Sequence, residues 1–380
     1  MSQTVGLYIH IPFCSKKCAY CDFYSLDTCT ESNWDVYLKA MCHHFKETAG
    51  SLVRQVVDTV YIGGGTPSLM GAKRLRALLE TVAKQCQLSS NAEITLEGNP
   101  ESLQDVSMLK KLRRCGVNRL SIGAQSFDDD MLALLGRAHD AQTAINAVNA
   151  ARTAGFSNLG IDLLFGLPGQ TADHWEKTLK AGLELAPEHI SCYGLTVEKG
   201  TPLYEARDVF NFPDDDAQAD MYLYTAEALR GAGYLHYEIS NYALPGYLCR
   251  HNMKYWTLEP YIGLGPAAHS DFGGRRWSYP RSLDAYITGV NTGDTLADYM
   301  EELPMRDRAG EYLMLGLRTS RGVSGNHYAR TFQVGFDAVE RRLEAQQARG
   351  NAIREGDRWR LTEQGFLLSN RVIGEVLDAL

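Results

Sequence analysis

Three cysteines near the start of the chain lie close enough in sequence to bind one metal centre. Cys14, Cys18 and Cys21 follow an apolar run, residues 7–11, that stops at Pro12. Thiolates are soft ligands that select iron–sulfur clusters, zinc or copper(I). A structural zinc site usually has four ligands, often as two Cys-x-x-Cys pairs, and the sequence has no second pair. Three thiolates on a four-iron cluster would leave one iron open to chelate a small molecule, whereas a zinc site or a disulfide loop is the alternative.

Composition limits the class of protein. The chain has 380 residues, of which 44% are hydrophobic, and this length predicts one large domain and a smaller one. The net charge of -8 provides no global basic field for a nucleic acid. No apolar run reaches the ~18 residues that a membrane span needs, and no signal-peptide pattern is visible. Nine cysteines, an odd number, favour a reducing cytoplasm over a disulfide framework.

Apolar runs typical of strands alternate with segments of helical period over the first 232 residues. This alternation predicts a parallel sheet with helices outside it. Six such units in a row leave a partial barrel and a doubly wound sheet as alternatives, and in both folds ligands gather at the carboxyl ends of the strands. The predicted strands are residues 5–11, 57–62, 93–96, 119–123, 159–165 and 190–195, and the predicted helices are residues 32–48, 72–85, 103–115, 141–154, 172–185 and 217–232.

A glycine-rich turn follows the second predicted strand. It reads Gly63-Gly64-Gly65-Thr66-Pro67. Glycines at a strand end let the backbone approach a ligand closely. A purely structural turn is the commoner explanation of such a pattern when it stands alone. No Gly-Lys-Ser/Thr follows, so the turn is not a phosphate-binding loop.

Polar side chains mark the ends of the next three predicted strands. Glu97 ends the third strand, and Gln125 emerges at the tip of the fourth. Arg137 has a planar fork suited to a carboxylate. Asp162 lies inside an apolar strand, where a carboxylate is costly unless it is hydrogen-bonded. Taken singly, each is as well explained by a polar group satisfied in the core or at the surface.

The cysteine spacing C-x3-C-x2-C, with Tyr20 before the last cysteine, resembles the cluster loop of the radical S-adenosylmethionine (SAM) superfamily. Membership implies a [4Fe-4S] cluster held by Cys14, Cys18 and Cys21, with SAM chelated at the open iron. One electron from the cluster then splits the sulfonium into methionine and a 5′-deoxyadenosyl radical. The resemblance also favours a partial (β/α)6 TIM-like barrel over a doubly wound sheet.

The strand-end residues match the order of SAM contacts in the HemN-like branch of that superfamily, over most of residues 1–270. The resemblance assigns Glu97 to the ribose hydroxyls, Arg137 to the SAM carboxylate and the glycine turn to the ammonium group. It places Tyr20 next to the adenine. The SAM-binding residues that it implies are Tyr8, Tyr20, Gly64, Gly65, Thr66, Glu97, Gln125, Arg137 and Asp162.

Two departures separate this chain from the oxygen-independent coproporphyrinogen III dehydrogenases of the same branch. Those enzymes carry a fourth cysteine two residues after the third, where this chain has Phe23. They also carry a longer N-terminal extension, for which the position of Cys14 leaves no room. Both departures count against porphyrinogen decarboxylation.

A second motif, HNMKYW at residues 251–256, resembles the H-N-x-x-Y-W signature of the HemW family of heme chaperones. His251 offers a neutral imidazole, a common iron ligand. Tyr255 and Trp256 have flat apolar faces suited to a porphyrin edge. A turn-capping histidine beside core aromatics is the alternative. The heme candidates are His251, Asn252, Tyr255 and Trp256, with Cys249 and His269 as weaker candidates for iron ligands. Arg275 and Arg276 are either partners of the propionates or simply solvated.

From about Met305 the pattern changes to helices, a turn and a short hairpin. This part resembles the small winged-helix-like domain that closes HemN-type barrels, and acidic residues nearly balance its arginines, which disfavours nucleic acid. We expect three domains: 1–240, the radical SAM core; 241–304, the H-N-x-x-Y-W segment and a connector; and 305–380, the C-terminal domain. The expected C-terminal elements are helices over residues 308–317, from 323 and over 336–349, a two-stranded wing at 352–354 and 359–361, and one final helix.

Together these resemblances imply a cytoplasmic heme chaperone that carries a [4Fe-4S] cluster and SAM and lacks coproporphyrinogen III dehydrogenase activity. Its implied partners are heme, acceptor hemoproteins, membrane-associated respiratory ones among them, and an electron donor for the cluster. A homodimer and peripheral association with the inner membrane are left open. The alternative is a radical SAM enzyme, either a HemN-like methyltransferase or a porphyrin-modifying enzyme such as a coproporphyrinogen III dehydrogenase. A winged-helix nucleic-acid binder is the third hypothesis.

Overall fold

The computed structural model describes residues 3–293 and 297–380. The chain divides into two compact units. The first comprises Met1–Pro213 and Pro260–Glu301, and the second comprises Asp214–Glu259 and Glu302–Leu380. The three domain ranges expected from the sequence remain a prediction. A search of the described residues finds no helix that is both long and apolar enough to cross a membrane.

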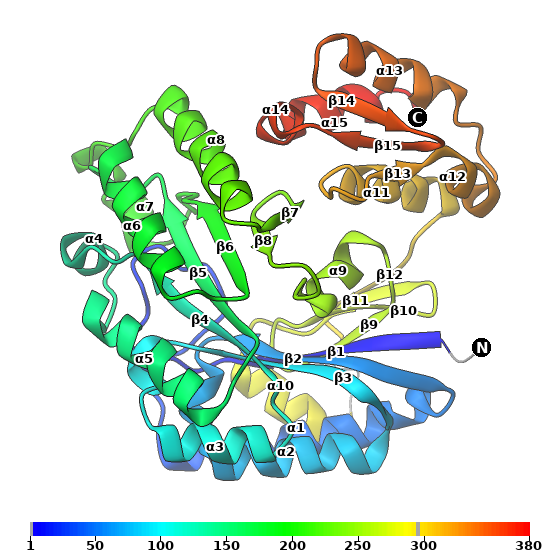
Figure 1. Cartoon of the computed structure of the whole chain (residues 1–380). Coiled ribbons are helices and arrows are strands. Elements are labelled where there is room, and N and C mark those ends of the chain that lie inside the picture. Colours follow the sequence, from blue (N-terminus) through cyan, green and yellow to red (C-terminus); the bar gives the residue numbers. More distant parts are fainter. Residues whose placement is uncertain (1–2, 294–296) are drawn as a thin grey trace. The chain divides into compact units, whose positions relative to one another are not determined.

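Six parallel strands form the centre of the first unit, and they neighbour one another in chain order. Figure 1 shows that this sheet curves, with its helices along the outer side. The predicted partial (β/α)6 barrel is therefore confirmed. The strands are β1 Gln3–Ile11, β2 Gln55–Gly64, β3 Gln87–Gly98, β4 Arg119–Gln125, β5 Leu159–Phe165 and β6 His189–Gly194.

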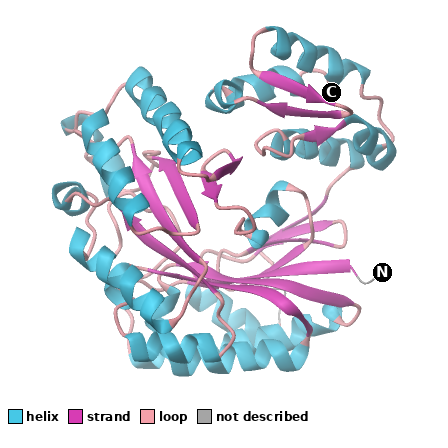
Figure 2. Cartoon of the chain, in the orientation of Figure 1, coloured by secondary structure: helices cyan, strands magenta, loops and turns pink. Residues whose placement is uncertain are grey.

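Figure 2 shows the helices of the first unit around its sheet. Most of them begin at a residue whose side chain caps the helix, whereas α2, Gly71–Gln85, has no such cap. Thr30 and Asn33 form a capping box at the start of one helix. Asp105 accepts a hydrogen bond from the Ser107 N–H, so the helix predicted from residue 103 begins only at Val106. The helices are α1 Glu31–Thr48, α2 Gly71–Gln85, α3 Val106–Arg114, α4 Asp129–Leu134, α5 Ala141–Ala154, α6 Ala172–Glu184, α7 Pro202–Glu205 and α10 Leu283–Thr292.

Alternation along β1 separates the core from the site. Val5, Leu7 and Ile9 are fully buried. Tyr8 and His10, which alternate with them along the strand, lie on the other face of the sheet, because successive side chains of a strand point to opposite faces. The same strand therefore contributes to the packing of the core and supplies polar groups to the opposite side.

Four further strands extend the sheet beyond β1. The strand β9, Tyr261–Leu264, pairs parallel to β1, and β10 and β11 continue the sheet in antiparallel order. The sequence predicted none of them, because these strands are short and alternate poorly. Their bounds are β10 His269–Phe272, β11 Arg275–Ser278 and β12 Tyr299–Glu302.

The second unit contains a three-stranded sheet among helices. The two strands predicted for its wing, β14 and β15, pair with each other. The prediction of only two strands was wrong, because Val323–Ser324 pairs with β15 as a third strand, β13. The Ser324 hydroxyl also caps the helix that follows. The single helix expected at the end is two helices, which meet at Leu368. The elements are α8 Asp215–Gly231, β7 Leu235–Glu238, β8 Asn241–Ala243, α9 Arg250–Trp256, α11 Met305–Gly316, β13 Val323–Ser324, α12 Gly325–Phe332, α13 Asp337–Ala348, β14 Ala352–Glu355, β15 Arg358–Leu361, α14 Glu363–Leu367 and α15 Ser369–Leu377.

Candidate functional site

Backbone hydrogen bonds hold the cysteine loop at both ends and in its middle. The Cys14 N–H donates to the Leu26 carbonyl at 2.9 Å, which closes the loop. In the middle, the Ala19 N–H donates to the Leu135 carbonyl at 3.0 Å, and the Ala19 carbonyl accepts from the Leu203 N–H at 2.8 Å. These anchors come from distant parts of the first unit. The loop is therefore fixed at the carboxyl end of β1, as the sequence predicted.

The three predicted cluster ligands are free, half-buried thiols. Burial raises the pKa of Cys14 and of Cys21. The Arg137 guanidinium donates to the Cys18 sulfur at 3.2 Å. Within residues 3–293 and 297–380, no three His, Cys, Asp or Glu side chains converge as they would on a single metal ion. A cubic cluster bonds each thiolate through a different iron, so three separated soft donors on one short loop fit such a cluster better than a single ion.

The glycine turn is required by the protein's own packing. A Cβ at Gly65 would lie 2.5 Å from the Phe13 carbonyl oxygen, and a Cβ at Gly64 would lie 2.6 Å from the His10 ring. Gly64 also has a φ of +112°, which favours glycine. The Thr66 N–H donates to Phe13 at 2.6 Å. The turn thus ties β2 to the cysteine loop, and the expectation that its glycines make room for a ligand stays a prediction.

Glu97 lies at the end of β3 with both carboxylate oxygens engaged. Oε1 accepts from the Tyr61 hydroxyl at 2.6 Å, and Oε2 accepts from the Gly64 N–H at 3.0 Å. Burial raises the pKa of Glu97 to about 7, and the nearby charge of Asp162 adds to the rise. Each carboxylate oxygen has further acceptor capacity. Glu97 can therefore still accept hydrogen bonds from a ligand, and its protonation changes near neutral pH.

Asp162 of β5 is held by hydroxyl groups from the two neighbouring strands. Oδ1 accepts from the Ser191 hydroxyl at 2.6 Å, and Oδ2 accepts from the Ser121 hydroxyl at 3.1 Å. Burial raises the pKa of Asp162, while these bonds and the charge of Arg119 oppose the rise. The cost of a carboxylate inside an apolar strand is thus offset by hydrogen bonds across β4, β5 and β6.

Arg137 connects the cysteine loop to the strand ends. Besides Cys18, it donates to the Asn99 side-chain oxygen at 2.8 Å and to the Gly123 carbonyl at 2.6 Å. Asn99 in turn donates to the Thr66 hydroxyl at 3.1 Å. The sequence prediction missed Asn99, although it stands two residues after Glu97. In this structure the Arg137 fork serves protein groups, so its contact with a SAM carboxylate stays a prediction.

The remaining SAM candidates also lie on this side of the sheet or on the loop. Gln125 has a left-handed backbone, with φ of +66°, which a non-glycine residue adopts at a cost of about 1–2 kcal/mol. The Tyr8 hydroxyl is 3.0 Å from His10 Nδ1, and burial lowers the pKa of His10 to about 4. Tyr20 packs against a core cluster that includes Leu135. The sequence prediction missed His10, although alternation along β1 places it beside Tyr8.

The H-N-x-x-Y-W segment forms the short helix α9 in the second unit. His251 is fully buried, and its Nε2 lies 2.8 Å from the Tyr255 hydroxyl, one helical turn away. The two rings meet edge to face, with centroids 5.2 Å apart. Asn252, Tyr255 and Trp256 are half-buried. One ring nitrogen that could ligate iron, Nε2, is thus engaged within the helix itself.

The weaker heme candidates are divided between the two units. Cys249 is fully buried and belongs to the second unit. His269 is exposed and belongs to the first. Arg276 forms an ion pair with Asp271 at 3.3 Å and a longer one with Glu301 at 3.9 Å, whereas Arg275 is exposed. The propionate role of Arg276 would therefore compete with two carboxylates of the protein.

Two family models match the chain. The radical SAM superfamily model matches residues 8–182, and the HemN C-terminal domain model matches residues 303–368. A protein named heme chaperone HemW from Lactococcus lactis is 34% identical over 97% of this chain and 96% of its own length. The HemW of Escherichia coli K12 is 34% identical over 97% of each chain.

This chain belongs to the HemW family.

The solved structure described as the Escherichia coli coproporphyrinogen III oxidase HemN, a radical SAM enzyme, matches the HemW-family chain with a TM-score of 0.87. It covers 100% of this chain and 91% of its own, at 23% identity. Because the identity is low, this likeness establishes the fold alone. The HemW relatives instead match both the barrel and the C-terminal domain in one continuous sequence comparison.

Proposed function

We propose that this protein is a heme chaperone that binds heme and delivers it to hemoproteins. The observation that carries the proposal is the 34% identity, over nearly the full length of both chains, to proteins named heme chaperone HemW. The retained H-N-x-x-Y-W motif supports it, because imidazole and flat aromatic faces suit an iron porphyrin. Its acceptor hemoproteins and an electron donor are the implied partners.

The proposal includes a resident [4Fe-4S] cluster and SAM. Cys14, Cys18 and Cys21 would hold the cluster, and this donor set of soft thiols fits it. When bound, cluster and SAM supply one-electron chemistry at a sulfonium. The residues proposed to hold SAM are Tyr8, Tyr20, Gly64, Gly65, Thr66, Glu97, Gln125, Arg137 and Asp162.

We also propose that the protein lacks coproporphyrinogen III dehydrogenase activity. Phe23 occupies the position at which those enzymes carry a fourth cysteine. A phenyl ring can neither ligate iron nor exchange a proton. Its side chain is 69% exposed at the edge of the cysteine loop. The chain thus has no thiol at that position.

Heme ligation through Nε2 of His251 requires its hydrogen bond to Tyr255 to break. A neutral hydrogen bond of this kind contributes about 0.5–1.5 kcal/mol net. An iron–imidazole bond can replace it if the helix turns its buried ring toward the porphyrin. The half-buried faces of Tyr255 and Trp256 could then stack on the macrocycle.

The experiment combines heme titration with heme transfer. Anaerobically reconstituted protein is titrated with heme and mixed with an apo-hemoprotein, with SAM present and absent. The proposal predicts a Soret band that shifts in His251→Ala and a spectrum that passes to the apo-hemoprotein, with no conversion of coproporphyrinogen III. Substrate-dependent release of 5′-deoxyadenosine with a mass-shifted product, and no heme transfer, would contradict it and favour a radical enzyme.

A further inference from the structure

One arginine of the first unit lies inside the barrel, on the face of the sheet that turns away from its helices. Arg119 is the first residue of β4 and is only 1% exposed. Its side chain shares a face with Ser121, because side chains two residues apart on a strand point to the same side. A charge buried this deeply is costly unless nearby groups compensate it. The groups around Arg119 therefore indicate its role.

The guanidinium of Arg119 lies against Gly160 of β5. The strand register pairs Ser121 with Gly160, and Gly160 with His189 of β6. A Cβ at Gly160 would lie 3.1 Å from Arg119 Nη2 and 3.4 Å from both His189 Nδ1 and the Ser121 hydroxyl oxygen. The absent side chain of Gly160 thus leaves the space into which the guanidinium reaches across the sheet.

Two carboxylates follow directly above this arginine, towards the carboxyl ends of the strands. The register pairs Glu97 with Ser121, and Asp162 with Ser191. The Ser121 hydroxyl, which lies close to the guanidinium, donates to Asp162 Oδ2 at 3.1 Å. Glu97 and Asp162 therefore form one layer of the barrel interior, and Arg119 lies in the layer beneath it.

Carboxylates outnumber the cation on these strands. The charged residues of β3, β4 and β5 are Glu93, Glu97, Arg119 and Asp162. Glu93 is 6% exposed and lies four residues before Glu97, on the same face of the strand. Like charges in one site disfavour each other's ionisation. Burial raises the pKa of Glu97 and of Asp162, whereas the charge of Arg119 opposes the rise in both.

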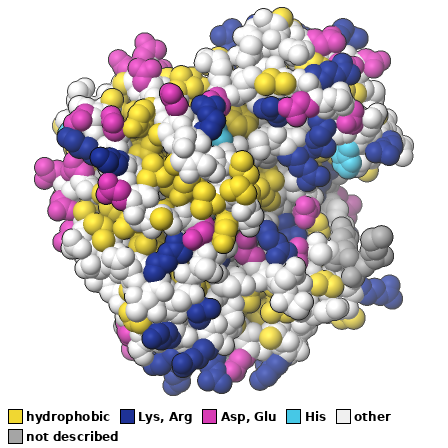
Figure 3. Space-filling model, viewed as in Figure 1, with side chains coloured by type: hydrophobic (Ala, Val, Ile, Leu, Met, Phe, Trp, Pro, Cys, Tyr) yellow, Lys and Arg dark blue, Asp and Glu magenta, His cyan; other side chains and the backbone are white. Residues whose placement is uncertain are grey.

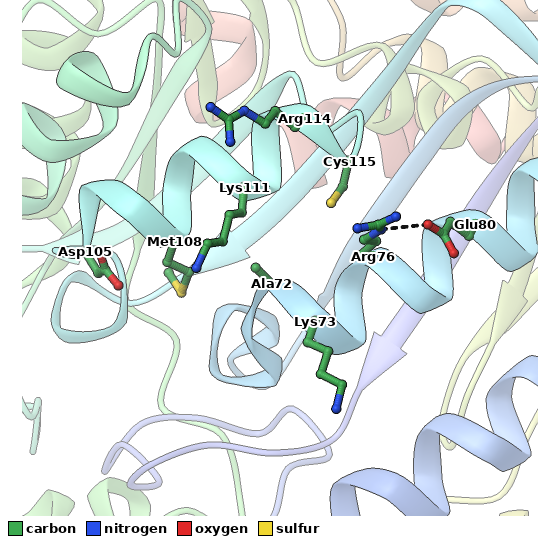
Figure 4. Close-up of a pocket in the computed structure, with 9 residues that line it drawn as sticks. All are labelled: Ala72, Lys73, Arg76, Glu80, Asp105, Met108, Lys111, Arg114 and Cys115. Carbon is green, nitrogen blue, oxygen red and sulfur yellow. Dashed lines mark hydrogen bonds and ion pairs between the residues drawn. The ribbon is translucent and has the colours of Figure 1, made fainter.

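The cations on the outer helices cannot replace Arg119. Figure 3 shows Lys and Arg side chains gathered along the lower edge, where Figure 1 places α2 and α3. Water and salt screen such exposed charges, whereas a buried charge is screened much less. Figure 4 shows four of these exposed side chains around the groove between α2 and α3, namely Lys73, Arg76, Lys111 and Arg114.

We propose that Arg119 is a positioning residue of the strand-end site, which keeps Glu97 and Asp162 ionised together so that Glu97 can accept hydrogen bonds from the ribose hydroxyls of SAM. This inference rests on the proposed SAM site and adds to it a residue that acts through the carboxylates. Without the cation, two carboxylates of one layer would share a proton, and a protonated carboxyl donates from one oxygen. The titratable and charged groups around Glu97 are Tyr8, Tyr61, Glu93, Arg119, Arg137 and Asp162.

The test is the pH profile of SAM binding by the cluster-loaded protein, measured by equilibrium dialysis from pH 6 to pH 9. The wild-type affinity should rise with a midpoint near pH 7, the pKa of Glu97. Arg119→Gln removes the buried charge and is expected to move this midpoint upward by about one pH unit. SAM binding then becomes about two- to three-fold weaker at pH 7.5 and returns close to the wild-type value at pH 9.

Two further variants separate charge from structure. Arg119→Lys keeps the positive charge and is expected to keep the wild-type midpoint. Arg114→Gln removes the same charge from an exposed side chain at the end of α3, the helix that leads into β4. We expect this control to keep the midpoint as well, because solvent screens its charge. Weaker SAM binding by Arg119→Gln at every pH, with an unshifted midpoint, would overturn the inference.

Urea denaturation of the same variants gives a second readout that needs no SAM. In Arg119→Gln, Glu97 holds its proton to a higher pH, so stability should fall further between pH 7 and pH 8.5 than in wild type. A variant that folds at pH 6 but not at pH 8.5 would support the inference, and one that fails to fold even at pH 6 would overturn it. Failure of wild type to bind SAM at any pH would instead overturn the proposed SAM site, whatever the denaturation shows.

Discussion

The strand-end site of the first unit and the α9 helix of the second hold their polar groups in different ways. At the strand ends, Glu97, Asp162 and Arg137 come from separate segments and are fixed by partners on neighbouring strands. In α9, His251 and Tyr255 come from one helical turn and bond to each other. The first arrangement keeps acceptor capacity at the carboxylates, whereas in the second the imidazole Nε2 is already engaged by the Tyr255 hydroxyl. One region is therefore built to receive a ligand, and the other must open to do so.

The largest effect that we expect is a loss of folding stability when His251 is replaced. Replacing His251 by Ala removes a fully buried ring and its bond to Tyr255, which is expected to cost about 2–4 kcal/mol of unfolding free energy. Urea denaturation measures it. The control His269→Ala removes an exposed ring and is expected to change stability by less than about 0.5 kcal/mol. Equal stability of the two variants would show that α9 is not closed by this ring.

A second prediction concerns pH at the strand ends. Glu97 has a pKa of about 7, so it loses its proton as pH rises through neutrality and becomes a stronger acceptor. SAM affinity of the cluster-loaded protein is expected to rise about ten-fold from pH 6 to pH 8. Equilibrium binding at several pH values measures it. Glu97→Gln should remove the dependence, and the exposed Glu47→Gln should keep it; a flat wild-type profile would refute the role of Glu97.

The same shift has an opposite effect on folding. A raised pKa means that the folded state binds the proton more tightly, so protonated Glu97 contributes its full stability below the ordinary value of 4.5. That contribution is lost as pH rises through about 7. Binding and stability should therefore change in opposite directions over this window in wild type, and neither should do so in Glu97→Gln.

A third prediction opens the helix without removing the histidine. Tyr255→Phe deletes the hydroxyl that holds His251 Nε2, so iron no longer competes with that bond. Heme affinity is expected to increase about five-fold, because one hydrogen bond contributes about 1 kcal/mol. Soret titration against wild type measures it. Weaker binding in Tyr255→Phe would mean that the hydroxyl contacts heme and does not merely close the helix.

The smallest effect comes from backbone strain. Gln125→Gly relieves the strain of a left-handed φ, which stabilises the folded state, but it also makes the unfolded chain more flexible. We expect the free energy of unfolding to rise by about 0.5 kcal/mol on balance. Gln333→Gly, at a left-handed position in the second unit, should raise the free energy of unfolding by the same amount. SAM binding should weaken only in the first variant, as measured by equilibrium dialysis. Equal SAM affinity in both variants would show that Gln125 does not contribute to SAM binding.

The parts of the site that follow from parallel strand order could be predicted from the sequence. Carboxyl ends of parallel strands meet at one edge, so the positions of Glu97 near the end of β3 and Gln125 at the end of β4 could be predicted, while Asp162 lies in the middle of β5. Their contact with SAM stays a prediction. The bridge through Asn99 was missed, because its partners Thr66 and Arg137 are distant in sequence. The burial of His251 was missed for the same reason, since a seven-residue helix does not reveal what packs against it.

The same limit explains the errors in the second unit. Val323–Ser324 is too short for a strand pattern, and only its pairing with β15 makes it one. The caps at Thr30 and Asp105 are local signals, but the sequence prediction did not use them, so α3 was predicted to begin at residue 103 and not at Val106. Tertiary pairing leaves no such local signal.

The most direct test of the account asks whether cluster and heme occupy separate regions. Anaerobically reconstituted wild type is compared with Cys14→Ala/Cys18→Ala/Cys21→Ala and with His251→Ala, and each sample is assayed for iron, sulfide and the Soret spectrum. The account predicts that the triple variant loses its iron and sulfide but keeps the wild-type Soret spectrum, and that His251→Ala keeps the cluster and loses that spectrum. A triple variant that still holds a cluster, or a His251 variant that loses it, would contradict the account.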